Sequence, residues 1–216
     1  MGDFPQMGAG FVYLARHGET AWNAEGRLQG HTDVPLNARG RDQAVALSAV
    51  LAHEQLCRIV TSDLSRARET GELCAVALGL APPDVDARLR ERGFGAFEGR
   101  TKADLARTEP EVWRRWTEDP HASPPGGESY LALAGRVAEG IGHAASSYAR
   151  PARPVLVVSH GAALRAFLAV TLGLEVPALG NGTLYRVAFR GGRLAEPELV
   201  WAGVDAPASA VNTPVR

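Results

Sequence analysis

The feature that most constrains the fold is the unbroken apolar run at residues 155–158, which Pro154 precedes and Ser159-His160-Gly161 follows. A strand with no alternating polar residues is buried on both faces, which is typical of the centre of a parallel sheet. Parallel strands need long crossover connections, and these are usually helices. The run therefore predicts an α/β protein.

Segments with strand and helix patterns alternate along the rest of the chain. Strands are predicted at 11–16, 57–62, 83–87, 154–159, 183–189 and 193–203, and helices at 36–55, 65–78, 101–107, 109–117, 128–148 and 161–171. Asn37 is the predicted N-cap of the first helix, and the residues between Gly18 and that helix are interpreted as a long loop. The alternation predicts a three-layer α/β/α sandwich around a mainly parallel sheet. The last two strands, joined at Gly191-Gly192, would add an antiparallel edge strand.

The length of 216 residues fits one domain with a buried core. We expect that domain to span 11–203, with a cap-like insertion at about 92–129 that is rich in glycine and proline. The segments 1–10 and 204–216 show little pattern and are predicted to be flexible.

Composition excludes several classes of function. A hydrophobic fraction of 45% and a charged fraction of 22% are typical of a globular protein, and the net charge of −1 favours neither nucleic acid nor anionic membrane as a partner. No apolar run is long enough for a membrane span, and no signal peptide is evident, so we expect a cytoplasmic protein. Cys57 and Cys74 lie outside any disulfide or zinc pattern.

Two predicted strands end in a His-Gly pair, at His17 and at His160. Ligands of parallel sheets bind at the carboxyl ends of the strands, so both imidazoles and the preceding Arg16 are expected at one rim. A third strand ends just before Arg66, at the start of a helix whose N–H groups favour anions. Glycine after each histidine allows an unusual turn and a close approach of the backbone to a ligand. The other histidines lack such a context and are interpreted as surface or helix-face residues.

Four motifs along the chain carry a family resemblance. Residues 16–23, Arg-His-Gly-Glu-Thr-Ala-Trp-Asn, resemble the RHGETxWN signature of the histidine phosphatase (phosphoglycerate mutase-like) superfamily. Residues 62–67, 89–95 continued by 97–99, and 159–161 resemble that family's second motif, acid-bearing loop and last motif, in family order. The resemblance covers about 11–202 and implies a phosphoglycerate mutase-like fold and phosphoryl-transfer chemistry.

The resemblance also implies roles at the rim. His17 would be the nucleophile that takes a phosphoryl group, while Arg16, Arg66 and His160 would surround its oxygens and stabilise their charge. Glu91 would protonate the leaving oxygen, which requires a proton on Glu91 at working pH. Neither a metal nor another cofactor is expected.

Several further residues are candidates. Glu98 is the runner-up acid, with a solvated surface residue as the alternative, and Glu19 is expected to support the His17 loop. Asn23 and Gln29 match positions of polar groups near the phosphate, although Gln29 also fits an ordinary loop. Thr183 is a candidate for the floor of the pocket.

The activity itself has two main interpretations. We expect a phosphomonoesterase acting on a small phosphorylated metabolite, because the stretch between Glu91 and Glu128 is short and because Thr20 and Gln29 stand where the cofactor-dependent mutases typically have Ser and Thr. The alternative is a phosphoglycerate mutase. A non-catalytic regulatory relative is the least favoured hypothesis, because all residues of the rim are present.

The segment around Trp113 and Trp116 bears on this choice. It faintly resembles the mutase segment whose paired arginines hold a substrate carboxylate, so Arg114 and Arg115 are candidate substrate ligands. The alternative is an exposed helix face, with the two tryptophans packing inside the cap. The oligomeric state, including a homodimer, is left open by the sequence.

Overall fold

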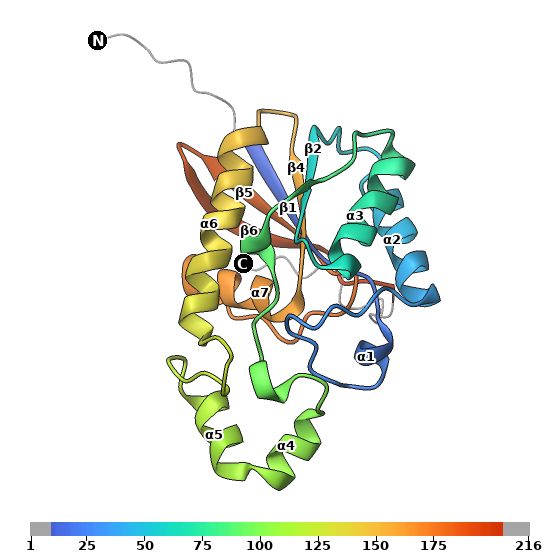
Figure 1. Ribbon diagram of the computed structural model, residues 1–216. Coiled ribbons are helices and arrows are strands. Elements are labelled where there is room, and N and C mark those ends of the chain that lie inside the picture. The colour runs from blue at the N-terminus through green and yellow to red at the C-terminus, as the bar shows by residue number, and fades with distance from the viewer. Residues whose placement is uncertain (1–9, 205–216) are drawn as a thin grey trace, which may run out of the picture.

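The computed structural model describes residues 10–204, and these form one six-stranded sheet in the order β3-β2-β4-β1-β5-β6 (Figure 1). The strands are β1 (Gly10–Arg16), β2 (Arg58–Thr61), β3 (Asp84–Val85), β4 (Val155–Ser159), β5 (Leu184–Arg190) and β6 (Arg193–Trp201). The pairs β1–β4, β4–β2 and β2–β3 are parallel, whereas β5 is antiparallel to both β1 and β6. The predicted mainly parallel sheet with an antiparallel edge is therefore confirmed.

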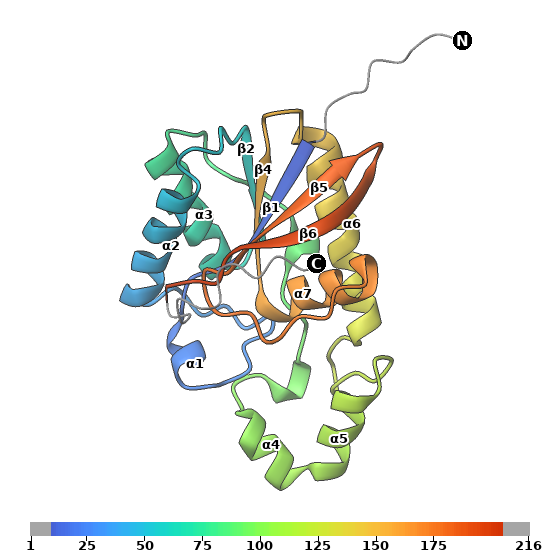
Figure 2. The ribbon, with the colours of Figure 1, turned by 180° about the vertical axis from the view of Figure 1, so that it is seen from behind.

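Helices cover both faces of this sheet, as Figures 1 and 2 show from opposite sides. The helices are α1 (Ala21–Ala24), α2 (Ala38–Val50), α3 (Ser65–Leu78), α4 (Lys102–Thr108), α5 (Pro110–Glu118), α6 (Tyr130–Tyr148) and α7 (Gly161–Ala166), with 3₁₀ turns η1 (Ala87–Leu89) and η2 (Gly95–Phe97) and the π-helical segment η3 (Phe167–Thr171). Helices α2 and α3 lie on one face, and α6 and α7 lie on the other. This is the predicted three-layer sandwich.

Strand β4 shows why the apolar run has this fold. Its side chains alternate between two cores, with Val155 and Val157 in the cluster that includes α6 and α7, and Leu156 and Val158 in the cluster that includes α2 and α3. All of these residues have no exposed surface. A strand covered by helices on both faces needs apolar side chains at every position.

Several predicted boundaries differ from the structure. The predicted loop after Gly18 contains α1, whose single turn is fixed by reciprocal hydrogen bonds between Thr20 and Asn23 and is too short for an apolar period. The predicted N-cap is confirmed, since the Asn37 side chain accepts a hydrogen bond from the Gly40 N–H at 2.8 Å. The predicted helix 161–171 begins as α7 and continues as η3.

The segment 92–129 lies beyond the carboxyl ends of the strands and carries α4 and α5 (Figure 1). Trp113 and Trp116 pack against the cluster of Phe94, Phe97 and Leu105, as predicted for cap packing. The predicted flexible segments 1–10 and 204–216 lie outside the described residues, apart from their inner end residues. No helix within 10–204 combines the length and apolar character needed to cross a bilayer.

Candidate active site

The two histidines that follow β1 and β4 meet at the rim of the sheet. Arg16 pairs with Ser159 in the strand register, and the His17 N–H donates to the Ser159 carbonyl at 3.0 Å. The rings of His17 and His160 consequently lie 5.0 Å apart between centroids, at an interplanar angle of 61°. Both side chains are buried, with 2% and 0% of their surface exposed. The structure thus brings together the two imidazoles that the sequence placed at one rim.

The glycine that follows His17 is needed for a structural reason that differs from the predicted one. A side chain at Gly18 would collide with the main chain of Gly40 in the first turn of α2. Gly18 therefore permits a close approach between the His17 loop and a helix, rather than between the backbone and a ligand. A side chain at Gly161, in contrast, would lie 3.3 Å from Nε of Arg16, inside the site itself.

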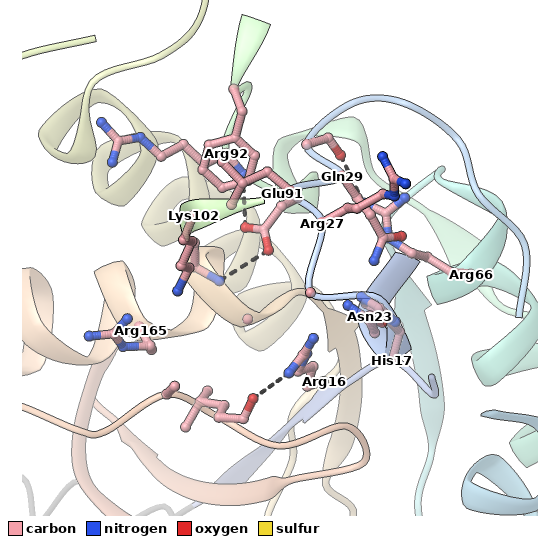
Figure 3. Close-up of a pocket in the computed structure, with 18 of the residues that line it drawn as sticks. Arg16, His17, Asn23, Arg27, Gln29, Arg66, Glu91, Arg92, Lys102 and Arg165 are labelled. Atoms are coloured by element: carbon pink, nitrogen blue, oxygen red, sulfur yellow. Dashed lines mark hydrogen bonds between the residues drawn. The ribbon is translucent and has the colours of Figure 1, made fainter. Parts of the chain in front are cut away.

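Arg16, which is half-buried, and Arg66, which is buried, bring two guanidinium groups to the same pocket (Figure 3). Arg66, at the start of α3, donates through Nη2 to the Gly30 carbonyl at 2.8 Å and through Nη1 to the Thr32 carbonyl at 3.1 Å. Arg16 donates through Nη1 to the Leu179 carbonyl. The Nε atom of each arginine is buried and has no hydrogen-bond partner among the described residues. Cations held in place by carbonyl groups are suited to binding an anion.

Both imidazoles are electrically neutral at neutral pH. Burial, followed by the nearby charges of Arg66 and Arg16, lowers the pKa of His17 well below its ordinary value. Burial and Arg66 have the same effect on the pKa of His160. A neutral imidazole retains a lone pair, which a nucleophile requires.

The tautomer of His17 follows from its one hydrogen bond. Nδ1 lies 2.6 Å from the carbonyl oxygen of Gly18. A carbonyl oxygen only accepts, so Nδ1 must carry the proton, and the lone pair resides on Nε2. The two ring nitrogens of His160 are buried without a partner among the described residues. One ring is therefore oriented with a free lone pair, beside a second ring able to donate to an incoming oxygen.

Glu91 lies between η1 and η2 and lines the same pocket. Its Oε1 accepts hydrogen bonds from the Arg92 and Ala163 N–H groups, both at 2.9 Å, and its Oε2 accepts from the Ala162 N–H at 3.1 Å. Residues 162 and 163 belong to the first turn of α7, directly after His160. The carboxyl group is thus fixed beside the second histidine, facing the pocket that Arg16 and Arg66 also line.

Glu98 has neither of its predicted roles. Its carboxylate accepts from the main-chain N–H groups of His31, Thr32 and Phe94 at 2.9, 2.8 and 3.1 Å, and from the Thr32 hydroxyl. Although burial opposes the shift, these hydrogen bonds lower the pKa of Glu98. Glu98 therefore holds two loops together, and it is not placed as an acid or as a solvated surface residue. Glu19, whose Oε1 accepts from the Asn37 amide at 2.8 Å, agrees with the predicted support of the His17 loop.

Asn23 and Gln29 both line the pocket. Oδ1 of Asn23 accepts hydrogen bonds from the Thr20 main chain and the Asn181 amide, both at 3.2 Å, so its amide nitrogen is the group left for a ligand. Gln29 is 5% exposed, and its Oε1 is buried without a partner among the described residues. Both side chains line the pocket, and the amide nitrogen of each, and not the accepting Oε1 of Gln29, is the group that would donate to a phosphate oxygen.

Three predicted residues are not brought to this pocket. The Thr183 hydroxyl donates to the carbonyls of Gly180 and Ala202 and stabilises a loop instead of forming the pocket floor. Arg114 and Arg115 line a separate depression on the outer side of α5. Because Trp113 and Trp116 direct the apolar face of α5 inward, these arginines point outward, where Arg114 pairs with two glutamates of its own helix.

The pocket, of about 300 Å³, has a second half that the sequence did not predict. This half is lined by Arg27, Arg92, Lys102, Trp116, Tyr130 and Arg165, among others. These residues come from the α1–α2 loop, the cap, the start of α6 and α7, and no motif links them. Within residues 10–204, no group of three His, Cys, Asp or Glu side chains could hold a metal ion.

Comparison with known proteins identifies the family of this chain. The model of the histidine phosphatase superfamily, branch 1, matches residues 12–200. The chain belongs to this family. This membership accounts for the paired His-Gly motifs and for the two arginines beside them.

Curated and solved relatives cover most of this histidine phosphatase. A glucosyl-3-phosphoglycerate phosphatase of Mycolicibacterium vanbaalenii is 39% identical over 181 residues, 79% of each chain. A probable phosphoglycerate mutase of Salmonella choleraesuis is 41% identical over 190 residues, 83% of this chain and 85% of the relative. The structure of a mycobacterial glucosyl-3-phosphoglycerate phosphatase with VO3 superposes with a TM-score of 0.79 at 33% identity, over 89% of this chain and 99% of that one. The fold and the class of enzyme, a phosphatase, are thereby shown.

Proposed function

We propose that this phosphatase hydrolyses small phosphomonoesters through a phosphohistidine intermediate on His17. The observation that carries the proposal is a neutral, buried imidazole with its Nε2 lone pair free, beside Arg16, Arg66 and His160. A mycobacterial glucosyl-3-phosphoglycerate phosphatase has been solved in a complex with VO3 and in a complex with inorganic phosphate, which supports phosphate binding by this chain.

In the first step, Nε2 of His17 attacks phosphorus and the bond between phosphorus and the ester oxygen breaks. The proton of the Glu91 carboxyl group passes to the leaving oxygen, so an alcohol departs and not an alkoxide. The Nε groups of Arg16 and Arg66 and the ring of His160 donate to the phosphoryl oxygens, whose negative charge spreads in the transition state. The negative charge that develops on the leaving oxygen and on the phosphoryl oxygens therefore always has a proton or a hydrogen-bond donor beside it.

In the second step, water attacks the phosphoryl group on His17. The Glu91 carboxylate takes the proton from this water, and the bond between phosphorus and Nε2 breaks. Inorganic phosphate and neutral His17 result, so the site returns to its starting state. A mutase would use a second phosphoglycerate hydroxyl in place of water, and the arginine pair that favoured this alternative lies outside the pocket.

The unpredicted half of the pocket supports a substrate with a second negative group. Lys102, the only lysine of the chain, and Arg165 line the pocket, and neither forms an ion pair within residues 10–204. In Figure 3 they lie on the opposite side of Glu91 from Arg66. We therefore propose a phosphorylated carboxylic acid of the phosphoglycerate type, in keeping with the substrates named for the relatives. Cytoplasmic location and a homodimer stay predictions.

The assay that tests hydrolysis compares two products. We expect 3-phosphoglycerate to release free phosphate, with little conversion to 2-phosphoglycerate even when bisphosphoglycerate is added as a primer. The ratio of the rate of phosphate release to the rate of conversion between the two phosphoglycerates distinguishes a phosphatase from a mutase. Primed exchange that is faster than phosphate release would identify the protein as a mutase instead.

Lys102→Met should weaken the binding of substrates that carry a carboxylate and leave the binding of other phosphate esters unchanged. Loss of a hydrogen bond to a charged group should raise the KM for 3-phosphoglycerate by at least about 10-fold. The KM for p-nitrophenyl phosphate, which has no carboxylate, should stay within about twofold, the spread usual for a surface substitution. Arg114→Met is the matched control, since that cation lies outside the pocket. Equal changes on both substrates would exclude Lys102 as the carboxylate ligand.

A further inference from the structure

The turn that carries Glu91 is held from behind by one arginine of α6. Nη1 of Arg136 donates to the main-chain carbonyls of Arg88 and Arg90 at 2.8 and 3.0 Å, and Nη2 donates to the carbonyl of Glu91 itself at 3.2 Å. Arg88 belongs to η1 and residues 90 and 91 follow it, so these three carbonyls lie outside the hydrogen-bonded ladder of the sheet. One side chain thus satisfies the carbonyls of Arg88, Arg90 and the proposed acid Glu91.

Arg136 is itself fixed by an ion pair. Its Nε donates to Oε1 of Glu128 at 3.0 Å, and its Nη2 donates to Oε2 at 2.7 Å. The two side chains are only 24% and 20% exposed. Together these contacts use Nε and both terminal nitrogens of the guanidinium group, whose rigid fork no lysine can reproduce.

The front of the same turn holds the Glu91 side chain. The carboxyl group binds the N–H groups of Ala162 and Ala163, while Nε2 of His31 lies 2.9 Å from the Glu91 carbonyl. Arg136 does not line the pocket, so it has no route to the substrate. Arg136 can therefore act on the reaction through the main chain of the turn, or through its charge, which lowers the pKa of His160 less than burial, Arg66, His17 and Arg16 do. An effect through His160 would change both substrates alike, whereas an effect through the turn would be selective.

We propose that Arg136 is a positioning residue, which locks the main chain at 88–91 so that the Glu91 carboxyl group stays within reach of the leaving oxygen. This inference rests on the proposed role of Glu91 as the general acid. A proton donor that is displaced by about 1 Å transfers its proton less efficiently, and such a displacement lowers the rate by up to about 10²-fold. The effect should appear only where the leaving group needs a proton.

Arg136→Met tests the proposal with two substrates. We expect kcat for glycerol phosphate, an alkyl ester, to fall about 10- to 100-fold, with little change in KM. For p-nitrophenyl phosphate, whose leaving group needs little protonation, we expect kcat to change less than about threefold. Arg136→Lys should lie between wild type and Arg136→Met, because lysine keeps the charge but loses the fork.

A matched control separates positioning from stability. Arg58 forms a similar two-point ion pair with Asp84, at the opposite end of the strands from the site. Arg58→Met should lower the melting temperature without changing the ratio of the two activities. If Arg136→Met does not fold, Arg136→Lys and Glu128→Gln carry the same comparison.

The double variant Glu91→Gln/Arg136→Met gives the sharpest outcome. If Arg136 acts through Glu91, the double variant should be no slower on glycerol phosphate than Glu91→Gln alone. Multiplied losses, or equal losses of Arg136→Met on both substrates, would overturn the positioning role. A selective loss in Glu91→Gln without one in Arg136→Met would overturn this inference alone, whereas no selective loss in Glu91→Gln would overturn the proposed acid.

Discussion

Replacing His17 with alanine is expected to abolish turnover of every phosphomonoester, lowering kcat by at least about 10⁴-fold, within the range reported for loss of a covalent nucleophile. The structure provides no substitute. His160 is the neighbouring imidazole, and in the proposed mechanism it donates to the phosphoryl oxygens and does not attack phosphorus. Steady-state release of phosphate from p-nitrophenyl phosphate and glycerol phosphate measures the effect.

His53→Ala is the matched control for this loss. His53 is exposed and lies just beyond α2, away from the pocket. Its replacement should leave kcat within about twofold of wild type. A His17→Ala protein that is folded, by its thermal unfolding transition, and that keeps more than a tenth of wild-type activity would contradict the account.

Glu91→Gln is expected to produce the second-largest effect, and a selective one. Glutamine has the same shape but no acidic proton, so kcat for glycerol phosphate should fall about 10²- to 10⁴-fold. The loss on p-nitrophenyl phosphate should be less than about tenfold, because nitrophenolate departs without full protonation. The ratio of the two kcat values is the measurement, since a change in the folded fraction cancels in it.

Glu91→Gln also has a structural cost that needs a control. The amide –NH₂ cannot accept from the N–H groups that the carboxylate now binds, so one of them is left without a partner. An unsatisfied buried donor costs about 1–3 kcal/mol of stability. Glu98→Gln is the control, because the Glu98 carboxylate also accepts hydrogen bonds from three main-chain N–H groups but does not line the pocket. Equal losses on both substrates in Glu91→Gln would remove Glu91 from the acid role.

The fold and the rim were predictable because they follow from local rules. The run at 155–158 had to be a central parallel strand, and the carboxyl ends of such strands meet. His17 and His160 therefore had to come together once both strands were recognised, and Arg66 followed from the strand before α3. The short helix α1 escaped prediction because its stability comes from side-chain caps on one turn, which leave no apolar period.

The second half of the pocket was not predictable because its residues share no motif. Lys102 and Arg165 lie on different helices and meet only through the packing of the cap over α7. The expectation for Arg114 and Arg115 failed for the same reason. Charged side chains on an amphipathic helix point away from its apolar face, and the apolar face of α5 is formed by Trp113 and Trp116.

The central claim, that His17 carries the phosphoryl group, is tested most directly by trapping. The protein is mixed briefly with a radiolabelled phosphomonoester, quenched in alkali because phosphohistidine is stable to base and labile to acid, and digested for peptide mapping. The account predicts label on the peptide that contains His17 in the wild-type protein and none in the His17→Ala variant. Base-stable label retained by the His17→Ala variant would contradict it.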